Sequence, residues 1–382
     1  MAEPAQQKVF APWEDPTEKP IIRFEGVTKR FGEFTAVDNL DLKIYRGEFF
    51  ALLGPSGCGK TTLMRMLAGF ESPTEGHIIL DGQDVAPIPP NKRPVNMMFQ
   101  SYALFPHLSV WENIAFGLKR EGMEKDRIEA RVSEMLRLTR LEQFARRKPH
   151  QISGGQRQRV ALARSLAKAP KLLLLDEPLG ALDKKLRQET QFELMDIQEK
   201  TGTTFVIVTH DQEEAMTVAT RVAVMDHGKL VQVATPAGIY EAPNSVYVAD
   251  FIGDVNIIEG AATPRSTPEG AQVEIAWAEG LAPIIATPTE PVSAGQKVHY
   301  AIRPEKILVS REPDMARANR VQGKVIDIAY LGNISTYRVR LANGQMISAS
   351  MTNARRLSRR DFTWDDEVWL NWTDGAGIVL TR

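Results

Sequence analysis

The sequence is poor in cysteine, since Cys58 is the only one among its 382 residues and no disulfide can form within the chain. A single thiol is typical of proteins from a reducing compartment, and we expect a cytosolic protein. Neither sign of charge is in excess, because 47 Lys and Arg residues face 48 Asp and Glu residues. This balance argues against the broad positive surface that non-specific nucleic-acid binding requires, so we expect no nucleic acid as a partner.

Long apolar runs are also missing. No stretch approaches the roughly 18 to 20 uncharged apolar residues that cross a bilayer. Residues 1–20 contain four prolines and lack the apolar segment of a signal peptide. We therefore expect residues 1–20 to form a flexible tail and the chain to be soluble by itself, so that any work at a membrane goes through a partner.

The rest of the chain shows two patterns of apolar residues. Residues 21–53 contain stretches that alternate apolar with polar, which predicts antiparallel strands. Residues 49–53, 172–175 and 205–208 are continuous apolar runs, which predict strands buried on both faces of a largely parallel sheet. Between them lies a predicted helix with one apolar stripe, made of Ile128, Val132, Met135 and Leu136.

Turn signals become frequent after about residue 240, and we expect an all-β domain there, most simply a small barrel. Residues 336–341 and 345–350 flank Ala342-Asn343-Gly344, which predicts a hairpin. The alternation of Val368, Leu370 and Trp372 predicts the last strand.

A glycine-rich segment, Gly54-Pro55-Ser56-Gly57-Cys58-Gly59-Lys60-Thr61, lies between an apolar strand and a predicted helix over residues 62–68. This is the context that a phosphate-binding loop requires. Its glycines let backbone N–H groups surround phosphates, and the helix N-terminus adds partial positive charge. Lys60 can reach the outer phosphates and the Thr61 hydroxyl can ligate Mg²⁺. We therefore assign residues 54–62, with Thr62 included, to a nucleotide site.

Polar residues at the ends of other apolar strands extend this site. Asp176 and Glu177 end the run at 172–175, where Asp176 can hold the metal and Glu177 can polarise a water for attack on the γ-phosphate. His210 follows the run at 205–208 and can hydrogen-bond the γ-phosphate, although a lone histidine is often structural. Gln100 can reach Mg²⁺ or the water, with a plain surface amide as the alternative. Phe31 can stack on adenine, with a core or turn aromatic as the equal alternative.

The stretch Ile152-Ser153-Gly154-Gly155-Gln156 completes a set of motifs in which the chain resembles the ATP-binding subunits of ABC transporters, with matches over residues 21–260. The resemblance implies a homodimer that sandwiches two ATP molecules, each on the phosphate loop of one copy. Ser153, Gly154, Gly155 and Gln156 would contact the γ-phosphate held by the other copy. Asp183, after Leu182, would cross the interface, where Gly180 replaces the family's serine. The alternative is that residues 153–155 form only a helix cap and a turn.

Residues 101–107, Ser-Tyr-Ala-Leu-Phe-Pro-His, resemble the importer version of the groove that receives a helix from each of two transmembrane permease subunits. Burial of these apolar residues against Ile114 and Phe116 is the alternative. Residues 251–256 and 302–305 resemble import ATPases for maltose, iron and polyamines. Within that group the chain most resembles those for putrescine. The resemblance implies an extracytoplasmic polyamine-binding protein as an indirect partner, and a peripheral place at the cytoplasmic face of the inner membrane. Spermidine, iron or a sugar are the alternative substrates.

Together these features predict an α/β phosphate-loop NTPase of ABC type, with a mostly parallel sheet, an antiparallel β subdomain and a helical subdomain at about residues 101–170. We place the ATPase domain at residues 21–255 and a regulatory, oligonucleotide-fold-like β-barrel domain at residues 256–382. By its fold, that second domain could bind an oligonucleotide or a small ligand, and it could equally pack for the dimer. The resemblance implies regulation and dimer contact. Its pairs Arg355-Arg356 and Arg359-Arg360 are better explained as a solvated face than as a nucleic-acid site.

Two other functional classes fit the sequence less well. A soluble ABC ATPase of DNA repair or translation usually has long coiled-coil insertions or two cassettes in one chain, and this sequence has neither. A ligand sensor with an inactive ATPase is disfavoured because Lys60, Asp176, Glu177 and His210 are all present.

Overall fold

The computed structural model describes residues 10–180, 183–268, 270–354 and 361–382, and the chain divides into two compact units, Met1–Ala237 and Gly238–Arg382. The second unit takes in two helices, α7 (Pro236–Glu241) in large part and α8 (Val246–Phe251), that the sequence placed with the ATPase domain. Helix α8 packs there because Arg303 donates to the carbonyl of Ala249 and the Val246 N–H donates to the carbonyl of Arg382. Helix α7 packs there because the Tyr240 hydroxyl donates to Glu305 at 2.6 Å. The pairs Arg355-Arg356 and Arg359-Arg360 lie outside the described residues.

A six-stranded sheet forms the centre of the first unit. Its strands are β3 (Phe49–Leu53), β6 (Val95–Met98), β7 (Leu172–Asp176), β8 (Thr204–Thr209), β9 (Arg221–Asp226) and β10 (Lys229–Ala234), in the order β10-β9-β3-β8-β7-β6. All neighbours are parallel except β10, which is antiparallel to β9. Every residue of β3 and β8 is buried. The parallel sheet predicted from the three apolar runs is therefore confirmed.

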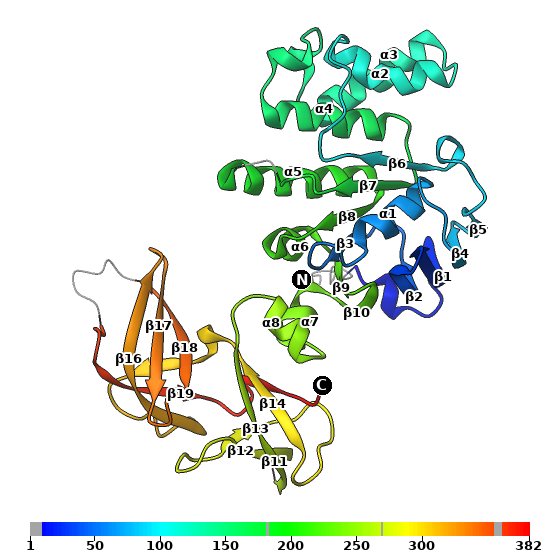
Figure 1. Cartoon of the computed structure of the whole chain (residues 1–382). Coiled ribbons are helices and arrows are strands. Elements are labelled where there is room, and N and C mark those ends of the chain that lie inside the picture. Colours follow the sequence, from blue (N-terminus) through cyan, green and yellow to red (C-terminus); the bar gives the residue numbers. More distant parts are fainter. Residues whose placement is uncertain (1–9, 181–182, 269, 355–360) are drawn as a thin grey trace, which may run out of the picture. The chain divides into compact units, whose positions relative to one another are not determined.

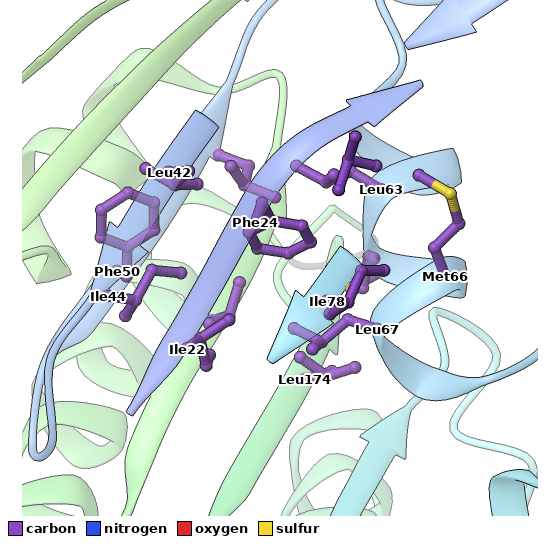
Figure 2. Packing of buried hydrophobic residues seen from close by; sticks show 14 of the residues in the cluster. Ile22, Phe24, Leu42, Ile44, Phe50, Leu63, Met66, Leu67, Ile78 and Leu174 are labelled. Atoms are coloured by element: carbon purple, nitrogen blue, oxygen red, sulfur yellow. The ribbon is translucent and has the colours of Figure 1, made fainter. Parts of the chain in front are cut away.

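An antiparallel sheet lies against the phosphate-loop helix. Its strands are β1 (Ile22–Phe31), β2 (Phe34–Ile44), β4 (Glu75–Leu80) and β5 (Gln83–Asp84), in the order β2-β1-β4-β5. Figure 2 shows Phe24 of β1 and Ile78 of β4 beside Leu63 and Leu67 of helix α1 (Lys60–Ala68), with Leu174 of β7 in the same cluster. Burial of these side chains stabilises the position of α1 between the two sheets.

Three helices form the separate helical part of this unit and lie together in Figure 1. They are α2 (Val110–Arg120), α3 (Lys125–Leu138) and α4 (Gly154–Ala167), with short 3-10 turns at Glu142–Phe144 and Pro149–Gln151. The buried residues of α3 are Ile128, Val132, Met135 and Leu136, as the predicted stripe requires. Two more helices, α5 (Lys184–Thr201) and α6 (Gln212–Val218), complete the unit, together with 3-10 turns at Pro12–Glu14 and Pro90–Lys92.

Part of the predicted tail contacts the domain. The guanidinium of Arg221 lies 4.8 Å from the ring centroid of Trp13, and it also forms a 2.7 Å ion pair with Glu48, whose side chain is fully buried. Residues 10–20 therefore carry an aromatic side chain that packs on the sheet. No helix in the described ranges combines the length and the apolar character that crossing a bilayer would require.

The second unit is all-β apart from short helices, as predicted. One sheet has the order β13-β12-β11-β14-β20 and comprises β11 (Asn256–Thr267), β12 (Gly270–Ala276), β13 (Ile284–Ala286), β14 (Lys297–Ile302) and β20 (Gly377–Leu380). The other has the order β15-β19-β16-β17-β18 and comprises β15 (Leu308–Ser310), β16 (Asn319–Tyr330), β17 (Ile334–Leu341), β18 (Met346–Thr352) and β19 (Glu367–Trp372). Both sheets contribute to one hydrophobic core.

The hairpin predicted around residues 342–344 is confirmed as β17 and β18. The prediction that residues 368–372 form the last strand is wrong, because β20 follows and pairs with β14. β20 is only four residues long and its partner lies far away in the sequence, so no local alternation pattern marks it.

Candidate active site

Four parallel strands end at one edge of the central sheet. β3, β8, β7 and β6 are neighbours in that order, and each is followed by a predicted site residue: Gly54, His210, Glu177 and Gln100, in the same order. Ligands of open α/β sheets bind outside the carboxyl ends of the strands. The topology therefore places the phosphate loop beside the polar residues that the sequence associated with it.

The phosphate loop contains glycines that no other residue could replace without a clash. A Cβ on Gly54 would lie 2.4 Å from the carbonyl oxygen of Met225. Gly59 has a φ of +103°, and a Cβ there would lie 2.3 Å from the carbonyl oxygen of Ala36. Gly59 also caps helix α1 and has no side chain to bind the first N–H groups of that helix. These N–H groups are the kind of donors that bind phosphate.

Lys60 is the first residue of α1 and is only 6% exposed. Its Nζ donates to the carbonyl oxygens of Gly54, at 2.7 Å, and Pro55, at 2.8 Å, and lies 3.6 Å from Sγ of Cys58. In the described part of the chain no carboxylate forms an ion pair with Lys60. A buried ammonium with only neutral partners favours an anion, so the loop fits the phosphates of a nucleotide.

The three residues predicted to be catalytic meet at one carboxylate. Nε2 of Gln100 donates to Oε2 of Glu177 at 3.2 Å, and Nδ1 of His210 lies 2.9 Å from Oε1 of Glu177. Glu177 has a φ of 44°, a left-handed conformation that is uncommon for a residue other than glycine. Such strained residues are concentrated at functional sites. The structure thus brings Gln100, Glu177 and His210 together, and their roles in catalysis stay predictions.

Asp176 lies next to Glu177 at the end of β7. Burial raises the pKa of the Asp176 carboxyl, and the negative charge of Glu177 raises it further, while Arg65 lowers it. No group of three or more His, Cys, Asp or Glu residues able to hold a metal occurs in the described ranges. A metal here would have few protein ligands, which fits Mg²⁺ because that ion usually binds one or two carboxylates together with phosphates and water. The predicted ligands Thr61, Gln100 and Asp176 are chemically suitable.

Sequence reasoning missed a buried network that fixes the turn after β8. The hydroxyl of Thr209 donates to Oε2 of Glu214 at 2.5 Å, and Asp211 pairs with Arg187 at 2.5 Å. Glu214 is 2% exposed, and burial raises the pKa of its carboxyl to about 7. Because His210 lies between Thr209 and Asp211, the network holds the segment that carries it. The sequence offered one signal for this network, because Glu214 follows the helix cap Asp211 by three residues, the spacing of a capping box.

Ser153 caps helix α4. Its Oγ accepts from the Gln156 N–H at 3.3 Å, and the Ser153 N–H donates to Oε1 of Gln156 at 2.8 Å. The cap proposed as the alternative is therefore present. It leaves the hydroxyl proton of Ser153 free to donate to another acceptor, so capping and phosphate binding are compatible.

The remaining predicted trans-subunit contacts surround the same helix start. A Cβ on Gly155 would lie 3.4 Å from Leu186 of α5, and Asp183 caps α5 by accepting from the Leu186 N–H at 3.0 Å. Leu182 lies outside the described residues. Among those that are described, none of Ser153, Gly154, Gly155, Gln156 and Asp183 forms a hydrogen bond or ion pair with the phosphate loop.

Phe31 lies at the end of β1 and is 47% exposed. Nζ of Lys29 lies 4.7 Å from its ring centroid, and the exposed Phe34 is its cross-strand partner. The side chain is not part of a core, but Phe31 lies directly before the turn at residues 32–33, so the turn alternative stays open. Stacking on adenine stays a prediction.

In the segment after Gln100, one aromatic residue packs inward. The rings of Phe105 and Phe116 are 4.4 Å apart between centroids, and the side chain of the fully buried Asn113 accepts from the Phe105 N–H at 2.9 Å. Phe105 and Phe116 are both half-buried, so packing between them accounts for Phe105 only in part, and the permease contact stays a prediction. Ser101, Ala103, Pro106 and His107 are exposed.

Two family models match the chain. The ABC transporter model covers residues 37–180, and the TOBE domain model covers residues 300–380. The chain is 54% identical over 363 residues to the putrescine transport ATP-binding protein PotG of Escherichia coli strain K12, covering 95% of each chain. It is 48% identical over 361 residues to the spermidine/putrescine import ATP-binding protein PotA of Nitrosospira multiformis, covering 94% of this chain and 98% of that protein.

Solved structures resemble the first part of the chain. The structure of cbiO1 from Clostridium perfringens, part of the ABC transporter complex cbiONQ, has a TM-score of 0.54 at 30% identity and covers 58% of this chain and 91% of its own. The dimeric, post-hydrolysis structure of the ATP-binding cassette MJ0796 bound to ADP and Pi has a TM-score of 0.50 at 33% identity, covering 56% of this chain and 98% of its own. The matched cassette is similar in both fold and sequence.

Proposed function

This chain belongs to the ATP-binding proteins of ABC transporters that carry a TOBE domain, and we propose from that premise that it hydrolyses ATP to drive import of a polyamine, with putrescine as the preferred substrate. The observation that carries the proposal is the convergence of Gln100 and His210 on the Glu177 carboxylate, beside the phosphate loop. The names of the relatives PotG and PotA support the polyamine.

In the proposed reaction the loop N–H groups and Lys60 bind the phosphates of ATP, and the exposed ring of Phe31 stacks on adenine. Glu177 takes a proton from a water molecule, whose oxygen attacks the γ-phosphorus as the bond to the β-phosphate oxygen breaks. Each Glu177 oxygen already accepts one hydrogen bond and keeps a further lone pair for the water. Gln100 and His210 hold the carboxylate at a fixed angle, and His210 also contacts the γ-phosphate.

The metal proposed for this site is Mg²⁺, held by Thr61, Asp176 and Gln100. When bound, it would neutralise charge on the phosphates. A cation there would also favour the ionised form of Asp176, whose pKa burial raises.

A second copy of the chain completes the site in this proposal. The Ser153 hydroxyl and the backbone N–H groups of Gly154 and Gly155, at the N-terminus of α4, are donors suited to an anion. Gln156 and Asp183 lie beside them. The dimeric structures of the MJ0796 cassette support such a pairing. Each ATP would then bridge the phosphate loop of one copy and the α4 N-terminus of the other, and hydrolysis would open the dimer.

The cycle of closing and opening would drive two transmembrane permease subunits, which receive substrate from an extracytoplasmic polyamine-binding protein. The chain would then work at the cytoplasmic face of the inner membrane as a peripheral subunit. Residues 101–107 would form the contact with the permease.

Uptake of labelled substrates tests this function. In a strain that lacks the chain, putrescine uptake should be lost, and the wild-type chain but not Lys60→Ala should restore it. Spermidine, iron and maltose are measured in parallel. A normal putrescine uptake with a defect in iron or maltose would overturn the substrate, and full rescue by Lys60→Ala would overturn the ATP requirement.

A further inference from the structure

Two consecutive residues just after Gln100 have a backbone conformation that L-residues avoid. Tyr102 has a φ of 61° and Ala103 a φ of 45°, and neither is a glycine. Left-handed residues normally occur singly, and a pair of them persists only where surrounding contacts hold it. The segment therefore needs an external partner to keep its shape.

That partner is Arg164 in the last turn of helix α4. Its Nη1 donates to the carbonyl oxygen of Ala103 at 2.7 Å, and its Nη2 donates to that of Tyr102 at 2.9 Å. The same guanidinium lies 5.5 Å from the ring centroid of Phe105. A planar guanidinium can hold two carbonyls in a fixed relative direction, which a lysine ammonium cannot do.

The constrained pair is connected directly to Gln100. The Tyr102 N–H donates to the carbonyl oxygen of Phe99 at 2.8 Å, which closes a tight turn with Gln100 and Ser101 at its tip. A rotation at Tyr102 would therefore reorient this turn. The Gln100 amide, whose Nε2 is 3.2 Å from Oε2 of Glu177, would move with it.

Arg164 is not required to fasten helix α4 to its surroundings. Nδ2 of Asn96 in β6 donates to the carbonyl of Ser165 at 2.6 Å, and Arg131 of α3 donates to the carbonyls of Leu166 and Ala167, both at 2.9 Å. These bonds hold the end of the helix just after Arg164, and before it Nε of Arg159 donates to Glu193 of α5 at 2.8 Å. Among the described residues, only Arg164 donates side-chain hydrogen bonds to the carbonyls of Tyr102 and Ala103.

We infer that Arg164 is a positioning residue for ATP hydrolysis, whose guanidinium holds Tyr102 and Ala103 in the left-handed conformation and thereby places Gln100 against Glu177. The inference rests on the proposed function, since it assigns a role in that reaction. It also connects the loop of Gln100 to the helix that begins at Ser153.

The experiment measures ATPase activity of the full-length chain carrying Arg164→Gln or Arg164→Lys, each with and without Ala103→Gly. Misplacing Gln100 should lower kcat about tenfold or more, because small displacements of catalytic groups have large effects on rate. The KM for ATP should stay within about twofold, since the phosphate loop is unaltered. Glycine adopts the left-handed conformation without strain, so Ala103→Gly should restore kcat to within about threefold of the wild type.

Arg131→Gln is the matched control, because it also removes an arginine that binds two backbone carbonyls of α4 but touches no residue of the Gln100 turn. It should leave kcat within about twofold while lowering the melting temperature as Arg164→Gln does. Unchanged kcat in both Arg164 variants would overturn the inference, as would a loss of kcat that Ala103→Gly does not relieve. A wild-type chain without ATPase activity would instead count against the proposed function.

Discussion

Replacing Glu177 with glutamine isolates the proposed proton transfer, because the change is nearly isosteric. The carboxylate accepts from Gln100 at 3.2 Å and contacts Nδ1 of His210 at 2.9 Å. An amide at the same position can present its oxygen to one neighbour and its NH₂ to the other, since both neighbours can donate or accept after an amide or tautomer flip. The geometry should therefore survive, and only the ability to accept a proton should be lost.

Because only proton acceptance is lost, the expected effect is a fall in the rate of ATP hydrolysis. Removal of a general base lowers rates by about 10² to 10⁴, which corresponds to about 3 to 5 kcal/mol in the activation free energy. ATP binding should be unchanged, because Lys60 and the loop N–H groups are not in contact with Glu177. With hydrolysis blocked, ATP-bound dimers should accumulate.

Two measurements on the same protein check this expectation. Phosphate release in the presence of Mg²⁺ gives kcat, and size-exclusion chromatography with and without ATP gives the fraction of dimer. Glu193→Gln, which removes a carboxylate that pairs with Arg159 away from this site, is the control. Turnover within about threefold of the wild type would refute the role of Glu177 as the base.

Three further outcomes are expected. Ser153→Arg should spare ATP binding by the monomer and abolish hydrolysis that depends on the dimer; survival of that hydrolysis would leave Ser153 as a helix cap only. Gly59→Ala should weaken binding of a fluorescent ATP analogue and destabilise the fold, because its Cβ would lie 2.3 Å from the carbonyl oxygen of Ala36. The control is Gly57→Ala, whose Cβ would have no heavy atom within 4 Å. It should lower the free energy of unfolding in urea by only about 1 to 2 kcal/mol, through backbone strain. Glu214 keeps its proton in the folded state up to about pH 7, where the unfolded state has lost it, so its own contribution to the free energy of unfolding should fall by up to about 3 kcal/mol as pH rises from 4.5 to 7. Glu214→Gln should flatten that dependence in urea unfolding at several pH values, and an unaltered pH profile would contradict the buried protonated carboxyl.

Much of the candidate site could be predicted because its residues belong to short motifs that are contiguous in the sequence. The segment from Gly54 to Thr61 needs its glycines to avoid clashes, and the structure gives the clash at Gly59 as 2.3 Å. The apolar runs that precede Gln100, Glu177 and His210 mark parallel strands, and parallel strands put their carboxyl ends at one edge of a sheet. The meeting of these three side chains thus follows from sequence pattern and elementary topology.

The place of helices α7 and α8 and the presence of strand β20 were harder to predict from the sequence. Helices α7 and α8 are short, and what assigns α8 to the second unit is a contact from Arg303, more than fifty residues along the chain. Strand β20 was missed for the same reason, since its pairing with β14 is not visible in four residues.

What the sequence by itself determined is therefore the nucleotide chemistry, because phosphate binding depends on backbone shape and on a few residues at fixed spacing. What only the tertiary structure decided is how that chemistry is held in place. Arg164 reaches Tyr102 and Ala103 across some sixty residues, and the hydroxyl of Thr209, the residue before His210, donates to the buried Glu214. Such contacts depend on how helices and strands pack against each other, and a hydrogen bond between distant residues leaves no periodic signal in the sequence.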